Sequence, residues 1–197
     1  MEIISHRRNT IDDLSSTPES YGIEIDIRSL GSRLILQHDP FVAGTDFHTW
    51  LRKYRHGTII LNVKEDGLES AVQAALFEHK IDNYFFLDQS IPSLVKTAKG
   101  GMRHSAVRVS EYEPVSAALS FAGLIDWVWV DCFTRFPLAA QDVLSLRQAG
   151  FSLCLVSPEL QGRSSETDIP LLIRELTENG ISADAVCTKR PDLWVED

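Results

Sequence analysis

The sequence predicts an α/β protein that folds as a single small (β/α)8 TIM barrel, one domain over residues 1–197. Short apolar runs alternate with longer amphipathic segments, which is the pattern of a parallel sheet covered by helices. Several of these runs contain few polar residues, as strands buried on both faces do. Eight such runs favour a closed barrel over an open sheet. The predicted strands are residues 2–5, 22–28, 58–63, 84–87, 105–109, 127–131, 151–156 and 183–188.

Helical patterns lie between most of these strands. Residues 67–79 carry apolar side chains at helical spacing. Residues 137–149 are predicted to begin with Pro137 in the first turn and to end before Gly150, and residues 167–179 to end in the same way before Gly180. These signals support helices that return the chain between parallel strands.

The barrel must be compact. Its 197 residues leave about 25 for each of eight units, so some helices are short, and residues 11–16 predict barely two turns. Residues 33–37 are expected to pair with the second strand through a turn around Gly31. The rival architecture, an open doubly wound sheet, is disfavoured because no Gly-rich phosphate loop follows the first strand.

Composition limits the functional classes. Hydrophobic residues make up 44% of the chain and charged residues 24%, as in a folded globular domain. The net charge of −9 disfavours general nucleic-acid binding. Three scattered cysteines suit a reducing cytosol, and the N-terminal sequence and the absence of long apolar runs predict a cytoplasmic protein without a membrane span. The oligomeric state is left open.

Two carboxylates share one face of the second predicted strand. Glu24 and Asp26 alternate there with Ile23, Ile25 and Ile27. Carboxylates inside a barrel need compensation, and a divalent cation, Mg²⁺ or Ca²⁺, supplies it through oxygen ligands. The alternative is an edge strand whose carboxylates face water.

Further polar residues stand at the ends of neighbouring strands. Asn62 and Lys64 share a face at the end of the third strand, where an amide oxygen suits a cation and an ammonium suits a phosphate. His6 follows the first strand and His38 follows residues 33–37. Two histidines beside a carboxylate pair can act as general acid and general base near neutral pH.

The other strand ends give weaker signals. Asp88, Arg108, Asp131, Ser157 and Lys189 occupy them, and Trp129 shares a face with Asp131. Glu65, Asp66 and Glu69 are expected at the start of the helix that follows the third strand, where acidic residues favour the helix dipole.

The segments ISHRRNT, YGIEIDIR, LILQHDP, LNVK and ADAVCTKRPDLW resemble the glycerophosphodiester phosphodiesterase family, within the phosphatidylinositol-specific phospholipase C-like superfamily. The combination of H-R, E-x-D and H-D at this spacing is specific to that family. The similar segments lie near both ends of the chain, and the similarity in the middle is weak. The resemblance implies a barrel fold and lipid metabolism. It implies His6 and His38 as the acid–base pair, Glu24 and Asp26 as cation ligands, and Arg7 and Lys64 as phosphate contacts. Apart from the resemblance, the positions of polar residues near the strand ends make Asn62 a third candidate cation ligand. They also make candidate supporting or pocket residues of Asp39, Arg108, Trp129, Asp131 and Lys189.

The chain departs from that family in three places. Asn62 stands where the family usually has a third acidic ligand. Arg8 replaces a glycine, and a family P-E-N-T is reduced to Asn9-Thr10. The family's long insertion after the second strand is missing, which predicts a more open site.

The predicted function is therefore a metal-dependent phosphodiesterase that acts on a glycerophosphodiester or a related small phosphodiester. Two alternatives remain. One is a catalytically degenerate barrel that binds a phosphorylated ligand. The other is a metal-dependent sugar-phosphate isomerase or lyase, for which the sequence names no base beside a carbonyl.

Overall fold

The computed structural model describes residues 1–195, and its chain forms two compact units. One unit combines Met1–Ile4 with the chain from Ala98 onward, and the other is Ser5–Thr97. The prediction of one domain over residues 1–197 stays a prediction. No helix among the described residues is both long enough and apolar enough to cross a membrane.

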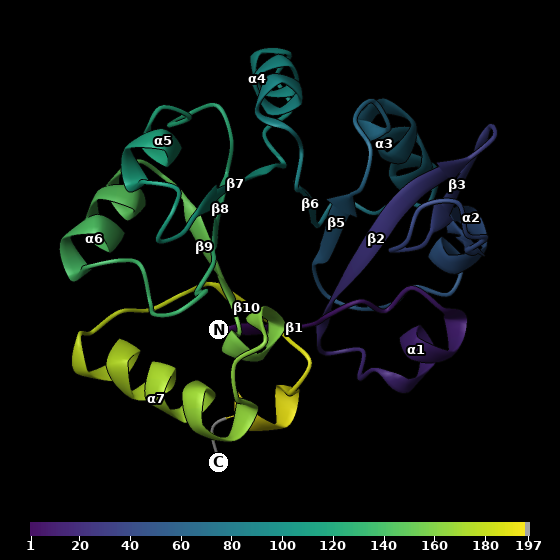
Figure 1. Ribbon diagram of the computed structural model, residues 1–197. Helices are drawn as coiled ribbons and strands as arrows, with labels where there is room; N and C mark the ends of the chain where they lie inside the picture. Colours follow the sequence, from purple (N-terminus) through teal and green to yellow (C-terminus); the bar gives the residue numbers. More distant parts are fainter. Residues whose placement is uncertain (196–197) are drawn as a thin grey trace. The chain divides into compact units, whose positions relative to one another are not determined.

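The Ser5–Thr97 unit contains a mixed sheet with a parallel centre (Figure 1). The strand β5 lies between β2 and β6 and is parallel to both, whereas β3 is antiparallel to β2 and β4 is antiparallel to β3. The bounds are β2 (Gly22–Leu30), β3 (Arg33–Leu36), β4 (Thr45–Asp46), β5 (Ile59–Val63) and β6 (Tyr84–Leu87).

The helices of this unit are short. They are α1 (Ile11–Ser16), α2 (Phe47–Leu51) and α3 (Glu69–Glu78), and α4 (Ile91–Lys99) runs across its boundary. A capping box fixes the start of α1: Asp13 N donates to Thr10 Oγ1 over 3.0 Å, and Thr10 N donates to Asp13 Oδ2 over 3.2 Å. The cap gives hydrogen-bond acceptors to two backbone N–H groups, those of Thr10 and Asp13, which would otherwise bond only to water.

The other unit contains parallel strands in the order β10-β9-β8-β7, with β1 beside β10. The strands are β1 (Glu2–Ser5, whose last residue belongs to the other unit), β7 (Ala106–Val109), β8 (Trp127–Val130), β9 (Ser152–Val156) and β10 (Ala185–Thr188). The helices are α5 (Val115–Leu119), α6 (Ala140–Gln148) and α7 (Ser165–Glu178), with 3-10 turns at Pro158–Gln161 and Pro191–Leu193.

Most predicted elements are confirmed, with ends shifted by a few residues. The α/β class and parallel pairing agree with prediction, and the turn at Gly31 (φ 65°) joins β2 to β3 as expected. Pro137 is not in the first turn of α6, which begins at Ala140. The cause is a cap one residue earlier, where Ala139 N donates to the Asp142 carboxylate over 2.9 Å.

The strand β2 is a buried interior strand, so the solvated-edge alternative for its carboxylates is wrong. It is paired with β3 and β5 on its two sides. Ile23, Ile25 and Ile27 are fully buried on one face, and Glu24 and Asp26 are 0% and 1% exposed on the other. Because both faces are buried, the two carboxylates lie in a region where an uncompensated charge is costly.

Candidate active site

The parallel pairing of β2 with β5 places three oxygen-bearing side chains together. Asp26 is opposite Asn62 in the register, and Glu24 is two residues earlier on the same face of β2. Asn62 Nδ2 donates a hydrogen bond to Glu24 Oε1 over 3.1 Å. The sequence prediction that these strands end side by side is confirmed for β2 and β5.

Asp26 is surrounded by positive charge and by an amide. Lys64 Nζ lies 3.1 Å from Oδ1, and Arg7 Nε lies 3.3 Å from Oδ2. Asn9 contacts it twice: Nδ2 donates to Asp26 Oδ2 over 2.9 Å, and Asp26 N donates to Asn9 Oδ1 over 2.9 Å. These contacts offset the cost of burying the Asp26 charge.

The Glu24 carboxylate accepts hydrogen bonds from neutral donors and lies near one histidine. Arg7 N donates to its Oε2 over 2.7 Å, and His6 Nε2 lies 3.7 Å from the same oxygen. Burial, helped by the negative charge of Asp26, raises the pKa of Glu24 to about 7, although the hydrogen bonds from Arg7 and Asn62 and the charge of Lys64 act in the opposite direction. Near neutral pH this carboxyl is therefore partly protonated, and a cation beside it would favour the ionised form.

The environment of the Asn62 side-chain oxygen indicates whether these residues suit a hard cation. Its Oδ1 is buried and accepts no hydrogen bond within residues 1–195, although an unsatisfied buried acceptor is unfavourable. Carboxylate and amide oxygens are the ligands that Mg²⁺ and Ca²⁺ prefer. Glu24, Asp26 and Asn62 therefore fit a divalent cation, with an amide in place of a third charge.

The loop after β1 is held against these carboxylates. Arg7 has the left-handed backbone conformation (φ 53°), which is uncommon for a residue with a side chain. In that conformation its backbone N–H reaches Glu24 while its guanidinium reaches Asp26. The next residue is also fixed, because Arg8 N donates to the Glu24 carbonyl over 2.9 Å and Arg8 O accepts from Trp50 Nε1 over 3.0 Å.

His38 lies after β3 and forms a pair with the next residue. Its Nδ1 is 2.8 Å from Asp39 Oδ1, and its side chain is 41% exposed. The hydrogen bond from His38 lowers the pKa of Asp39, as do the charges of Arg7 and Arg28. Arg28 also donates from Nε and Nη2 to the His38 carbonyl over 3.0 and 2.9 Å. An acceptor on Nδ1 leaves Nε2 as the nitrogen that is available to a substrate.

The remaining candidates belong to the other unit. Arg108 Nη1 forms an ion pair with the buried Asp131, which also accepts from Gln161 Nε2 over 2.5 Å. Trp129 is buried, and the backbone N–H of Lys189 donates to Glu159 over 2.9 Å. Roles for Arg108, Trp129, Asp131 and Lys189 stay predictions.

Two residues of the site, Asn9 and Arg28, are not predicted from the sequence, and the burial of a third, Glu69, is not predicted either. Asn9 stands in the sequence only as part of a shortened family motif, whereas Arg28 continues the Glu24–Asp26 alternation by two residues, which is the signal that could have found it. Glu69 lies in the first turn of α3, as expected, and its side chain is buried, where it accepts hydrogen bonds from Gln89 over 3.0 Å and from Ser93 over 2.9 Å. Its environment could not be deduced from α3 alone because both donors come from the next helix and its leading loop.

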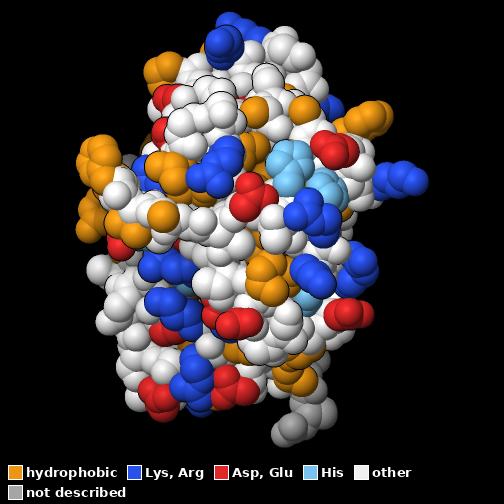
Figure 2. Space-filling view, turned by 90° about the vertical axis from the view of Figure 1, so that its right-hand side faces the viewer, with side chains coloured by type: hydrophobic (Ala, Val, Ile, Leu, Met, Phe, Trp, Pro, Cys, Tyr) orange, Lys and Arg blue, Asp and Glu red, His pale blue; other side chains and the backbone are white. Residues whose placement is uncertain are grey.

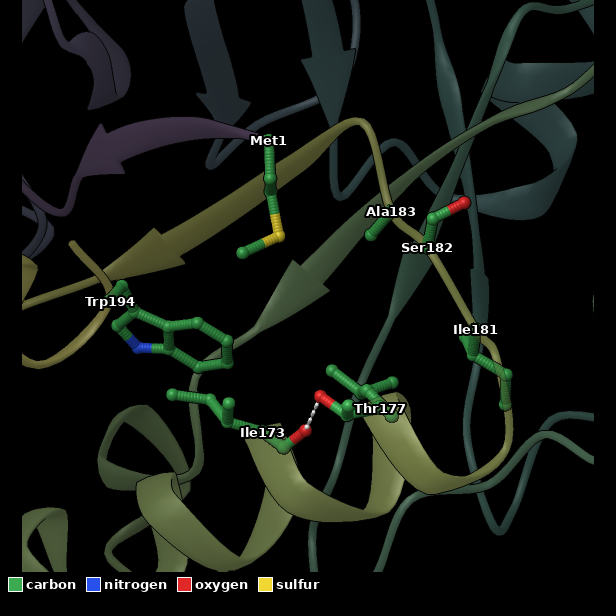
Figure 3. A pocket seen from close by; sticks show the side chains of 8 residues that line it. Met1, Ile173, Thr177, Ile181, Ser182, Ala183 and Trp194 are labelled. Atoms are coloured by element: carbon green, nitrogen blue, oxygen red, sulfur yellow. Dashed lines mark hydrogen bonds between the residues drawn. The ribbon is translucent and has the colours of Figure 1, made fainter. Parts of the chain in front are cut away.

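A cavity of about 270 Å³ lies elsewhere, in the unit that includes Met1 and α7. Figure 3 shows Met1, Ile173 and Trp194 around it, with Thr177 Oγ1 donating to the Ile173 carbonyl over 2.8 Å. Its lining residues include no acidic, basic or histidine side chain. It offers no acid–base or cation-binding chemistry, so the candidate site remains the cluster around β2.

Comparison with known proteins gives a match at the level of structure. No protein-family model matches the chain, and no curated protein matches it in sequence. A glycerophosphodiester phosphodiesterase from Agrobacterium tumefaciens matches with a TM-score of 0.69 at 14% identity, over 98% of each chain. This chain has the glycerophosphodiester phosphodiesterase fold. A glycerophosphoryl diester phosphodiesterase from Parabacteroides distasonis also matches, with a TM-score of 0.69 at 16% identity. The match covers 98% of this chain and 84% of the Parabacteroides distasonis chain. The resemblance stated from the sequence is thus confirmed for the fold.

Proposed function

We propose that the protein is a phosphoric diester hydrolase that cleaves a glycerophosphodiester or a related small phosphodiester. The observation that carries the proposal is the group formed by the buried Glu24, the free oxygen of Asn62 and the two cations that flank Asp26. The fold likeness supports the same chemistry, because both solved structures described above are phosphodiesterases by name.

Glu24, Asp26 and Asn62 would hold the divalent cation, Mg²⁺ or Ca²⁺. When bound, such a cation supplies positive charge to the phosphoryl oxygens as negative charge grows on them. Arg7 and Lys64 already lie beside Asp26, on the two sides of its carboxylate. They would orient the non-bridging phosphate oxygens and neutralise their charge.

His6 and His38 would move the protons. One takes the proton from the attacking oxygen, which belongs to water or to a neighbouring hydroxyl of the substrate. As the new phosphorus–oxygen bond forms, the bond to the leaving alcohol breaks, and the other histidine donates its proton to that alkoxide. Asp39 would keep His38 in the tautomer whose Nε2 faces the reaction. A neighbouring hydroxyl gives a cyclic phosphate first, whereas water gives the monoester directly.

Two further expectations remain proposals. The closed eight-stranded barrel is supported by parallel pairing within each unit and by the likeness to solved structures. A cytoplasmic location is supported by the three scattered cysteines, Cys132, Cys154 and Cys187, which are buried and lie far apart in the sequence.

Hydrolysis of bis-p-nitrophenyl phosphate tests the function. We expect turnover with Mg²⁺ or Ca²⁺, and loss of turnover with a chelator or in Glu24→Gln. Glu19→Gln is the matched control, because it makes the same chemical change at an exposed residue outside the site. If the wild-type protein binds phosphate esters but never cleaves this diester or glycerophosphodiesters with either cation, the binding-only alternative replaces the proposal.

A further inference from the structure

Three potential metal ligands lie together outside the candidate active site. His48 belongs to α2, Glu78 is the last residue of α3 and His79 caps that helix. One ligand atom from each side chain lies within 4.8 Å of those of the other two. Figure 2 views the side of the molecule where α2 and α3 lie and shows histidine side chains gathered there beside an acidic one.

His48 and Glu78 approach each other without a hydrogen bond between the two atoms that lie nearest. His48 Nδ1 lies 3.9 Å from Glu78 Oε2, which is too far for a hydrogen bond. Two ligands of one tetrahedral zinc ion lie about 3.4 Å apart, given metal–ligand bonds of about 2.1 Å. The observed distance between His48 Nδ1 and Glu78 Oε2 is therefore closer to the distance between two ligands of one zinc ion than to the length of an ordinary hydrogen bond.

The histidine rings add a second, independent observation. His48 and His79 have ring centroids 5.6 Å apart and an interplanar angle of 46°, so they are not stacked. His79 Nε2 is shielded from solvent and has no hydrogen-bond partner in the described part of the chain. A buried imidazole nitrogen without a partner is uncommon, and a metal ion is one of the groups that satisfies it.

The backbone holds two of the ligands in place before any ion arrives. His79 N donates to the Ala75 carbonyl over 3.2 Å, and the chain then turns through Lys80 in the left-handed conformation (φ 60°). On the other side, Asp46 caps α2 by accepting from Thr49 N over 2.8 Å. Glu78 is 71% exposed and His48 42% exposed, so both side chains can rotate to close the remaining distance.

We propose that His48, Glu78 and His79 form a second metal site, which binds one Zn²⁺ ion and joins α2 to the end of α3. Two imidazoles and one carboxylate are a donor set that zinc accepts, with water in the open position, whereas Mg²⁺ prefers oxygen ligands alone. The site would stabilise the helix that supports the loop after β1, because Trp50 of α2 donates to Arg8 in that loop. It does not depend on the proposed phosphodiesterase activity.

Calorimetric titration of ZnCl₂ in the presence of excess MgCl₂ tests the site, because Mg²⁺ competes at the oxygen-ligand cluster but not at imidazole. We expect one equivalent of zinc to bind, and the unfolding midpoint to rise with zinc concentration. His48→Ala and His79→Ala should each weaken zinc binding by about tenfold or more and remove the thermal shift. Glu78→Gln should also weaken binding, and because Glu78 is exposed the substitution should leave the fold intact.

Two controls separate this site from other sources of zinc binding. His104→Ala removes an exposed histidine elsewhere, and Glu24→Gln alters the candidate active site; both should keep one equivalent of zinc at wild-type affinity. Zinc binding that survives His48→Ala and His79→Ala, or that is lost in Glu24→Gln, would overturn the proposal. So would the absence of zinc binding to the wild-type protein.

Discussion

Asn62 donates through Nδ2 to Glu24 Oε1 over 3.1 Å, while its own Oδ1 lies buried with no donor in residues 1–195. The Nδ2 group of the Asn62 amide thus donates to a carboxylate, and its Oδ1 atom is available to a cation. Glu24 accepts hydrogen bonds from Arg7 N and Asn62 Nδ2, and burial raises its pKa to about 7. The two residues together give the cluster a need for positive charge that the surrounding chain only partly meets.

The first prediction concerns the charge at position 62. Asn62→Asp should bind Mg²⁺ and Ca²⁺ more tightly because it adds a charged oxygen at nearly constant size, and Asn62→Ala should bind them more weakly. Activity need not follow affinity, since a more negative site repels the phosphate. Calorimetric titration of each cation into the three proteins measures the effect. Identical affinities in all three would exclude Asn62 as a ligand.

The second prediction concerns the histidines. His6→Ala and His38→Ala should each lower kcat on a phosphodiester by about 100-fold or more while leaving the far-ultraviolet circular dichroism spectrum unchanged. The reason is that each would remove a proton-transfer group without removing a cation ligand. His104→Ala, an exposed histidine outside the cluster, is the matched control. Near-wild-type turnover in either active-site variant would contradict its role.

The third prediction is a dependence of stability on pH that comes from Glu24. Its pKa is raised to about 7 in the folded protein from an ordinary value of 4.5, so the folded state binds more protons than the unfolded state between these values. The Glu24 contribution to the free energy of unfolding is therefore full below about pH 4.5 and is lost as pH rises through about 7, by roughly 1–3 kcal/mol.

Urea unfolding from pH 5 to pH 8 without divalent cations measures this contribution. Glu24→Gln should remove it, and Glu19→Gln at an exposed position should not. Added Mg²⁺ should restore stability at pH 8, because a cation favours the ionised carboxyl. A wild-type profile that matches that of Glu24→Gln across this range would show that Glu24 does not titrate in this way.

The sequence predicts which side chains share a face on β2 and at the end of β5, because strand alternation is a strong local signal. Glu24, Asp26, Asn62 and Lys64 occupy alternating positions, so their shared faces follow from the pleat alone. Asn9 could not be found in this way, since its two hydrogen bonds to Asp26 depend on a loop folding back across 17 residues. The left-handed conformation of Arg7 is equally invisible, because nothing in the residue type favours it.

For the helices too, local signals predict some ends, whereas ends that depend on a particular side-chain contact are not predicted. Gly150 and Gly180 mark helix ends correctly, since both have positive φ and follow α6 and α7. The start of α6 was predicted at Pro137, whereas a capping carboxylate three residues into the helix places it at Ala140. The short helix α2 has too few turns for a periodic pattern, and its place comes from the burial of Phe47 and Trp50.

The last prediction separates the two effects of Lys64. Its Nζ lies 3.1 Å from Asp26 Oδ1 and 3.9 Å from Asp88 Oδ2, and its charge lowers the pKa of Glu24. Lys64→Met keeps most of the side-chain volume and removes the charge, so the carboxylate cluster becomes more negative. We expect Mg²⁺ to bind more tightly to this variant, because a competing cation has left Asp26. We also expect kcat on a phosphodiester to fall by about 100-fold, since a contact that neutralises the transition-state charge is gone.

Lys64→Arg keeps the charge in a different geometry and should leave the Mg²⁺ affinity near that of the wild type. Calorimetry and initial rates on the same preparations test both parts: weaker Mg²⁺ binding in Lys64→Met would mean that Lys64 supports the cation site, and an unchanged kcat would mean that it does not contact the phosphate.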